Sequence, residues 1–350
     1  MYMIKILHSG DWHLDSPLQG RTEEQASFLR QELLKIPDKI AALCKEENCD
    51  LVLLSGDLFD GAYTQETYRR VHTALRQMEV PVFITPGNHD YISPDSPYEK
   101  ETWPENVHIF KKQQVEWVDL PGLRVYGAGF QSMDCPGLLE GFRAEGYAVG
   151  VFHGDPTQVS SPYNPVTKNQ VLKSGLRYLA LGHVHKGDSF TAGDTLCAWA
   201  GCPMGRGWDE EGEKGVLIVS LEEFAQIKFV PLDTPKFYDL RVDFANGIGS
   251  VLPAVPGTDF YRVTLTGEAE SVDLEALRGA FSAFPNLVLR DETRKPVDPW
   301  EQAGEDSFEG MYFGILKEML DTASEAEKEK ILLAAKLSRQ ILDGQEVALP

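Results

Sequence analysis

Apolar residues cluster in short runs along the chain, and polar or glycine-rich segments separate these runs. Runs rich in β-branched and aromatic residues, each ending near Gly, Asp or Asn, predict strands at 3–8, 51–55, 81–85, 123–127, 147–153, 177–182 and 215–220. Helix-like segments lie between the first strands, at about 23–47 with an interruption near Pro37, and at 64–78. This alternation predicts an α/β domain with parallel strands. After about residue 100 the strands follow one another more closely, which predicts a second sheet.

The pattern changes near residues 231–238. A strand at 260–266, a helix at 273–284 and a strand at 286–290 predict a small separate α/β unit, followed by an acidic linker at 296–308. Two further helices are expected at about 309–321 and 325–343, the second with the capping pair Ser324 and Glu327 at its start. The predicted parts are 1–235, 236–300 and 301–350.

Composition narrows the class of protein. The chain has 350 residues, of which 42% are hydrophobic and 25% charged, as in ordinary globular proteins. It shows no apolar run of membrane-spanning length and no secretory signal pattern, so we expect no membrane association. Five cysteines without a C-x-x-C pair argue against a disulfide framework or a structural zinc site, and favour a reducing cytoplasm. The net charge of −21 disfavours non-specific coating of nucleic acid.

Five short polar motifs stand where predicted strands end: "SGDWH", "SGDLFD", "PGNHD", "FHGD" and "LGHVH". Functional groups gather at the carboxyl ends of strands in open α/β sheets. In an extended backbone alternate side chains point the same way, so Asp11 and His13 can face one site, as can His183 and His185. The motifs therefore predict one shared site.

These motifs supply carboxylates, a carboxamide and imidazoles, and no thiolate. Such mixed nitrogen and oxygen ligands suit Mn²⁺, Fe²⁺ or Zn²⁺ better than Ca²⁺. Seven ligands exceed one tetrahedral site but fit two ions that share a carboxylate, an arrangement common in phosphoester hydrolysis. We expect two divalent metal ions, with Mn²⁺ favoured.

The order D-x-H, G-D-x-x-D, G-N-H-D, H-G and G-H-x-H over residues 9–186 resembles the calcineurin-like metallophosphoesterases. The stretches "DWHLDSPLQG", "GHVHKG" and "GCPMGRGWDEEGEKG" resemble its bacterial DNA-repair exonuclease branch, the SbcD/YhaO-like proteins. The resemblance continues more weakly beyond residue 236, which would form a capping domain. It implies two packed mixed β-sheets flanked by helices, a small C-terminal α/β cap and a terminal helix pair.

The resemblance also implies a role for each motif residue. The first metal would be held by Asp11, His13, Asp57 and His185. The second would be held by Asp57, Asn88, His153 and His183, with Asp57 bridging the two ions.

His89 would contact the scissile phosphate and protonate the leaving oxygen. Some nucleases of the family have a His three residues after the bridging Asp, whereas this chain has Asp60 there. We expect Asp60 to orient a metal ligand without touching the metal, and Asp90 to orient His89.

Basic residues are candidates for substrate contact. Lys168, Lys173 and Lys186 lie in a stretch that lacks acidic residues, where a rim for a nucleic-acid backbone and an ordinary solvated surface are both open interpretations. Arg206, in the glycine-rich loop, would either contact phosphate or fix the loop by pairing with a neighbouring acid.

The expected activity is a two-metal phosphodiesterase that acts on DNA, as an exonuclease and single-strand endonuclease in DNA repair. By the resemblance, the terminal helix pair would dock an SMC/Rad50-like ATPase with coiled-coil arms, and a homodimer remains open. Two alternatives stay open as well. One is a phosphodiesterase or phosphatase for small-molecule or protein phosphoesters, and the other is a non-catalytic scaffold on the same fold.

Overall fold

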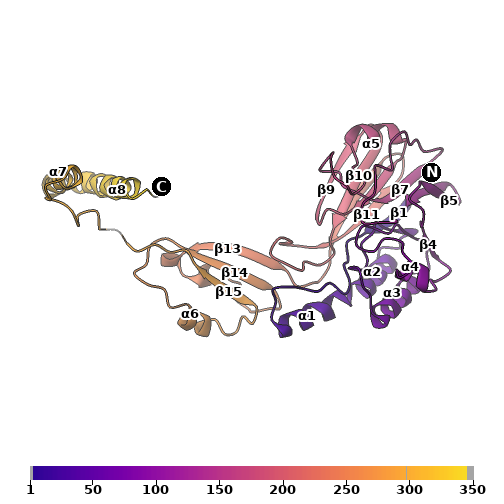
Figure 1. The fold of residues 1–350 in the computed structure, drawn as a ribbon, viewed down its shortest axis with the longest axis horizontal. Helices are drawn as coiled ribbons and strands as arrows, with labels where there is room; N and C mark the ends of the chain where they lie inside the picture. The colour runs from indigo at the N-terminus through magenta and orange to yellow at the C-terminus, as the bar shows by residue number, and fades with distance from the viewer. Residues whose placement is uncertain (1–2, 297, 345–350) are drawn as a thin grey trace. The chain divides into compact units, whose positions relative to one another are not determined.

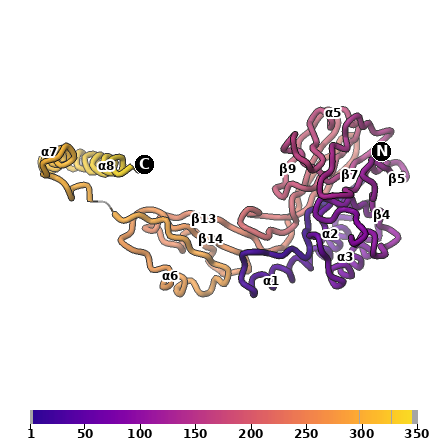
Figure 2. Tube along the Cα trace, in the orientation of Figure 1, coloured from indigo at the N-terminus to yellow at the C-terminus, as the bar shows by residue number. Residues whose placement is uncertain are grey.

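The computed structural model describes residues 3–296 and 298–344. Its first sheet has six strands in the order β12-β11-β1-β2-β3-β4. The bounds are β1 Ile4–Ser9, β2 Leu51–Leu54, β3 Val82–Ile84, β4 Val107–Ile109, β11 Gly215–Leu221 and β12 Ala225–Pro231. Strands β1 to β4 run parallel, while β11 pairs with β1 in the antiparallel sense. The late strand β11 therefore lies beside the first strand, β1, as labelled in Figure 1, and Figure 2 traces the chain between them by residue number.

A second six-stranded sheet has the order β5-β6-β7-β8-β10-β9. Its strands are β5 Glu116–Leu120, β6 Leu123–Ala128, β7 Ala148–His153, β8 Tyr178–Gly182, β9 Lys186–Ala192 and β10 Thr195–Gly201. Strands β6, β7, β8 and β10 are parallel, and β5 and β9 close the edges as antiparallel hairpin partners.

The two sheets pack face to face, and helices cover their outer faces. Alternate residues such as Ile6, Leu53, Val151 and Ala180 form the core between the sheets. The outer face of the first sheet is covered by α1 Glu23–Leu33, α2 Ile36–Glu46 and α3 Gln65–Met78. The outer face of the second is covered by α5 Lys168–Ser174, and α4 Pro97–Lys100 is a short turn of helix (Figure 1). Every central strand is therefore buried on both sides, which accounts for the nearly continuous apolar runs in the sequence.

The predicted fold class is confirmed: two packed mixed sheets are flanked by helices. Within these two sheets, strands β5, β9, β10 and β12 were absent from the sequence prediction. Strands β5, β9 and β12 have alternating exposure or carry many polar residues, because each lies at a sheet edge. Edge strands bury only part of their surface, so hydrophobicity alone identifies them poorly.

The chain divides into two compact units. The first comprises residues 1–239 and 257–261, and the second comprises 240–256 and 262–350. A three-stranded sheet has the order β13-β14-β15, with bounds Phe237–Asp243, Phe260–Thr266 and Leu287–Asp291. It is accompanied by α6 Leu274–Ala280 and the 3-10 turns η1 Phe244–Asn246 and η2 Ile248–Ser250. The predicted boundaries at 235 and 300 stay predictions.

Two helices end the described chain: α7 Phe308–Thr322 and α8 Glu325–Leu342. Ser324 caps α8 in a reciprocal hydrogen-bond pair with Glu327, as its sequence predicts. Among residues 3–296 and 298–344, no helix combines the length and the apolar character that crossing a membrane requires.

Candidate metal centre

The five motifs stand at the carboxyl ends of neighbouring strands. Asp11 and His13 follow β1, Asp57 follows β2, and Asn88 follows β3 in the first sheet. In the second sheet His153 ends β7, and the segment with His183 and His185 joins β8 to β9. Because both sheets present these ends to the same region, residues as far apart as 13 and 185 come into contact.

Four of these residues have positive φ angles, a backbone conformation that residues other than glycine rarely adopt. The φ angles are 52° at Asp11, 46° at His13, 50° at Asp57 and 100° at His183. A positive φ costs an L-residue about 1–2 kcal/mol, and such strain gathers at functional sites. Their sharp turns bring successive polar side chains to the end of each strand.

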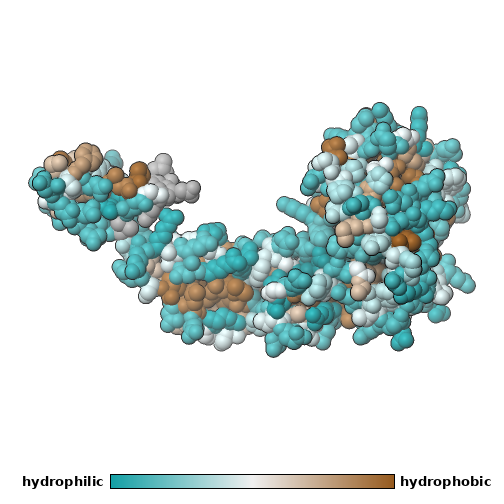
Figure 3. Space-filling model, in the orientation of Figure 1, coloured by the Kyte–Doolittle hydropathy of each residue, from teal (hydrophilic) through white to brown (hydrophobic). Residues whose placement is uncertain are grey.

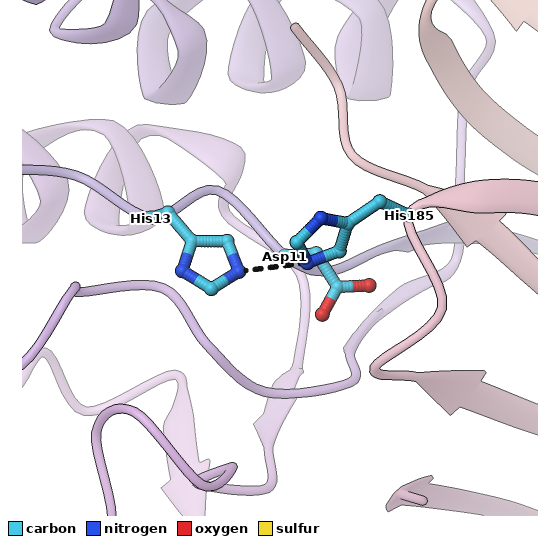
Figure 4. A group of neighbouring side chains, drawn as sticks. All are labelled: Asp11, His13 and His185. Atoms are coloured by element: carbon cyan, nitrogen blue, oxygen red, sulfur yellow. Dashed lines mark hydrogen bonds between the residues drawn. The ribbon is translucent and has the colours of Figure 1, made fainter. Parts of the chain in front are cut away.

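One cluster is formed by Asp11, His13 and His185, whose ligand atoms lie within 4.8 Å of one another. Figure 4 shows the two rings meeting edge on, with Nε2 of His13 3.0 Å from Nε2 of His185. The Asp11 carboxylate accepts the backbone N–H of His183 at 2.9 Å, which ties the first motif to the last.

A second cluster surrounds Asp57. Its Oδ2 atom lies 3.4 Å from Nε2 of His153 and 3.7 Å from Nε2 of His13, so this carboxylate faces both clusters. The Asn88 Oδ1 atom lies 2.8 Å from His153 Nε2 and 3.1 Å from Nδ1 of His183. The structure thus brings together all seven of the expected ligands.

The candidate ligand atoms of the first cluster suit a cation. Nδ1 of His185 faces the Glu210 carboxylate at 2.7 Å, so this ring carries its hydrogen on Nδ1 and its Nε2 atom has a lone pair. Nε2 of His13 lies 3.0 Å from that Nε2, while Nδ1 of His13 is buried without a hydrogen-bond partner, 3.5 Å from Asp60. With its hydrogen on Nδ1, His13 would turn a second lone pair toward His185, and a cation could then bind both nitrogens and the Asp11 carboxylate.

In the second cluster, three hydrogen-bond acceptors face one another and no donor lies among them. His153 donates from Nδ1 to the carbonyl oxygen of Ser55 at 2.9 Å, which leaves its Nε2 as an acceptor. That nitrogen faces two further acceptors, the Asn88 carboxamide oxygen and the Asp57 carboxylate. Acceptors that converge without a donor are the pattern expected around a metal ion.

Burial sets the charge of these groups. It lowers the pKa of His13 to about 3 and that of His183 to about 4, so both imidazoles are neutral near pH 7. The pKa of His153 is also lowered by burial. Burial raises the pKa of Asp57 to about 6, an effect that the charge of His89 only partly offsets. The neutral imidazoles have lone pairs that can bind a cation, and a cation would stabilise the charged form of the Asp57 carboxylate, which burial destabilises.

His89 differs from the seven ligand candidates because its side chain is 46% exposed. Its Nδ1 atom lies 2.5 Å from Oδ1 of Asp60, and its backbone N–H donates to Asp57 at 2.9 Å. The hydrogen bond with Asp60 raises the pKa of His89. Asp60 therefore contacts both His89 and the candidate ligand His13, and its orienting role stays a prediction.

Asp90 has a different set of partners from the one expected. Its buried carboxylate accepts the backbone N–H groups of Gly87, Asp57 and Leu58 at 2.7, 3.2 and 2.8 Å, and the hydroxyl of Tyr98 at 2.6 Å. Asp90 thus joins the loop after β3 to the loop after β2, whereas Asp60 bonds the His89 ring.

The basic residues considered for substrate contact differ in burial: three lysines are exposed, and Arg206 is largely buried. Lys168 and Lys173 are exposed on α5, and Lys186 is exposed at the start of β9. Arg206 is largely buried and paired: its Nη2 atom lies 2.7 Å from Oε1 of Glu210. Of the two interpretations that the sequence left open for Arg206, the structure contains the pairing with a neighbouring acid.

Two acidic residues near the histidines were absent from the sequence prediction. Glu210 contacts His185, and Asp155 lies 3.9 Å from Nε2 of His183. Asp155 stands inside the motif "FHGD", so proximity to His153 was an available signal. Glu210 lies among three consecutive acids, and the sequence does not distinguish the one that turns inward.

Residues 4–187 match the model of the calcineurin-like phosphoesterase family. The match covers more than half of the chain, and the fold and clustered ligands agree with it. The chain belongs to this family of metallophosphoesterases, hydrolases that bind two divalent metal ions. The family resemblance seen in the motifs is thereby confirmed.

Two relatives from Bacillus subtilis are similar to this chain over different lengths. The chain is 30% identical over 238 residues to the "Uncharacterized metallophosphoesterase YhaO" of Bacillus subtilis, covering 62% of this chain and 57% of that protein. It therefore spans a little over half the length of that relative. It is 23% identical over 372 residues to the SbcD component of the nuclease SbcCD of Bacillus subtilis, covering 88% and 92%.

Solved structures show more distant likeness. A crystal structure of TT1561 from Thermus thermophilus is 14% identical, with a TM-score of 0.42, covering 65% of this chain and 99% of that one. That likeness is too distant to say anything about function.

Proposed function

We propose that this chain is a two-metal DNA phosphodiesterase, an exonuclease and single-strand endonuclease of DNA repair in the cytoplasm, with Mn²⁺ as its metal. The observation that carries the proposal is the position of Asp57, whose Oδ2 atom faces His13 on one side and His153 on the other. A carboxylate between two acceptor clusters suits a bridging ligand of two ions. The relative named as a nuclease supports DNA as the substrate.

The seven candidate ligands would be shared between two metal ions. Asp11, His13 and His185 would hold one ion, Asn88, His153 and His183 would hold the other, and Asp57 would bridge them. When bound, the ions lower the pKa of water and withdraw charge from the phosphate.

His89 would give the leaving oxygen its proton. Its Nδ1 atom is engaged by Asp60, so Nε2 carries the transferable proton. An exposed imidazole whose pKa is raised by its hydrogen bond with Asp60 suits both phosphate contact and proton transfer.

The net charge of −21 opposes DNA binding, so the positive charge has to be local. The two ions would add about four positive charges at the site. Lys168, Lys173 and Lys186 would extend this surface along the DNA backbone, with Lys186 adjoining His185 in the chain.

The terminal helix pair supports a protein partner. On α7, Phe308, Met311, Ile315 and Met319 recur at helical spacing and are 50–79% exposed. Brown atoms on this helix pair in Figure 3 mark the apolar surface. Such a stripe suits docking against another helix, and we propose the coiled-coil arm of an SMC-like ATPase as its partner.

Degradation of labelled DNA in Mn²⁺ tests the proposed activity. The wild-type protein should degrade the DNA, while His89→Ala and Asp57→Ala should lose activity. Equal rates in all three would show a contaminating nuclease. Turnover of chromogenic phosphoesters without DNA cleavage would favour the small-substrate alternative, and lack of bound metal after growth in Mn²⁺ would favour the scaffold.

Deletion of residues 308–350 tests the partner. The shortened chain should keep phosphoesterase activity and lose binding to a purified SMC-like ATPase from the same organism. Unchanged binding would refute docking through the helix pair.

A further inference from the structure

The loop between β10 and β11 places Glu210 directly behind His185. Its Oε1 atom lies 2.7 Å from Nδ1 of His185, on the side of the ring opposite the metal centre. Its carboxylate is nearly buried, with the side chain 5% exposed. A buried carboxylate beside a candidate metal ligand therefore comes from a segment that holds none of the five motifs.

Arg206 holds this carboxylate in place. Its backbone N–H donates to Oε2 of Glu210 at 2.7 Å, and its Nη2 atom donates to Oε1 at 2.7 Å. These two charge-assisted hydrogen bonds from Arg206 fix both the position and the orientation of the Glu210 carboxylate. These contacts also occupy the guanidinium group of Arg206, and the Arg206 side chain is only 15% exposed.

The arrangement determines which nitrogen of His185 carries the hydrogen. A carboxylate only accepts, so Nδ1 donates to Glu210 and Nε2 keeps its lone pair. Arg206 Nη2 lies 3.3 Å from the same Nδ1, but both groups are donors and meet through their shared acceptor, Oε1 of Glu210. Without that carboxylate, the guanidinium would face the ring directly and favour the tautomer with hydrogen on Nε2, which cannot bind a metal through Nε2.

We propose that Glu210, held by Arg206, is a positioning residue that fixes the tautomer and ring orientation of His185 for divalent-metal binding. This inference rests on the two-metal centre of the proposed function. It assigns Arg206 to supporting the metal site and not to binding substrate. Loss of such an outer carboxylate costs about 10- to 100-fold in metal affinity. The loss should fall on the ion that His185 contacts.

Titration of Mn²⁺ into the metal-free full-length protein tests the proposal without substrate. The variant Glu210→Gln keeps the shape of the side chain, and Glu211→Gln is a matched control because Glu211 is exposed on the same loop. We expect one of two Mn²⁺ sites to weaken by about 10- to 100-fold in Glu210→Gln and neither to change in Glu211→Gln. Unchanged affinity in Glu210→Gln would overturn the proposal, as would equal weakening of both sites with a lowered melting temperature of the metal-free chain.

A second variant and a spectroscopic measurement separate positioning from general folding. Arg206→Lys keeps the charge and loses the planar fork, and it should weaken the same Mn²⁺ site. In ¹⁵N-histidine spectra of the metal-free protein, the His185 signal, assigned by its loss in His185→Gln, should show hydrogen on Nδ1 and should shift in Glu210→Gln. An unshifted signal would overturn the role of Glu210.

The outcomes also separate this proposal from the proposed function. DNA cleavage with unchanged Mn²⁺ binding in Glu210→Gln would refute the positioning role alone. Site-specific loss of Mn²⁺ in a chain that never cleaves DNA would refute only the choice of substrate.

Discussion

Oδ1 of Asp60 lies 2.5 Å from Nδ1 of His89. The carboxylate is only 13% exposed, whereas the imidazole is 46% exposed, so the pair has a buried end and an accessible end. The buried end fixes the tautomer, and the accessible end presents Nε2. A His at position 60 would lack the negative charge that Asp60 places beside the His89 ring.

Asp60→Asn should shift the pH dependence of activity. Asp60 raises the pKa of His89, so the protonated form, which would serve as the acid, persists to higher pH and is lost as pH rises through that raised pKa. Removing the charge lowers the pKa, and the alkaline limb of the kcat/KM profile should move to lower pH. The exposed Asp95→Asn is the control. An alkaline limb at the wild-type position in Asp60→Asn would contradict this role.

His89→Ala should act on the leaving group. General acid catalysis contributes about 10²- to 10⁴-fold, and a leaving group that needs no proton gains less from it. We expect kcat to fall by that range on DNA and by much less on a p-nitrophenyl phosphodiester, with Mn²⁺ affinity preserved. Equal losses on both substrates would exclude proton donation to the leaving oxygen.

Gly87→Ala should disable the metal centre through a steric clash. A Cβ at this position would stand 2.2 Å from Oδ1 of Asp57 and 2.8 Å from Nδ1 of His153. The Asp57 carboxylate, which we propose bridges the two ions, would have to move, so calorimetry should show weakened binding of both Mn²⁺ ions. Gly257→Ala is the matched control, because nothing lies within 4 Å of its added Cβ. Wild-type binding in Gly87→Ala would remove Asp57 from the bridging position.

Asp90→Asn should destabilise the protein. The carboxylate of Asp90 accepts from five donors, including the N–H groups of Gly87 and Leu58, and an amide would place its own N–H against one of them. A loss of about 3 kcal/mol is expected in the free energy of unfolding, measured by urea in the metal-free protein. Asp38→Asn, which breaks an exposed pair with Arg70, should cost about 0–1 kcal/mol. A comparable small cost at both positions would contradict the structural role of Asp90.

Metal removal should lower thermal stability. The candidate ligand atoms of Asp11, His13 and His185 lie within 4.8 Å of one another, so an ion bound there would tie together segments that are far apart in the chain. An ion present at 100 times its dissociation constant stabilises by about 2.7 kcal/mol per site. The melting temperature should fall after chelation and recover with Mn²⁺, and it should respond far less in Asp57→Asn. An identical response in that variant would place the stabilising ions elsewhere.

The sequence by itself determined the order of the central strands along the chain, the position of each motif at a strand end, and the family. These features depend on local patterns, because strand-forming runs and the turns after them are encoded by neighbouring residues. The candidate ligands at Asp11, Asp57 and His153 could be predicted for this reason. The edge strands β5, β9 and β12 could not, since their burial depends on what lies beside them.

Only the tertiary structure decided which groups support the ligands. Glu210 reaches His185 across 25 residues of sequence, and Asp90 binds backbone N–H groups from a loop more than 30 residues earlier. Such contacts depend on how two sheets pack and how far each loop extends past its strand. Those distances arise from the packing of the whole first unit, so no local pattern of residues encodes them.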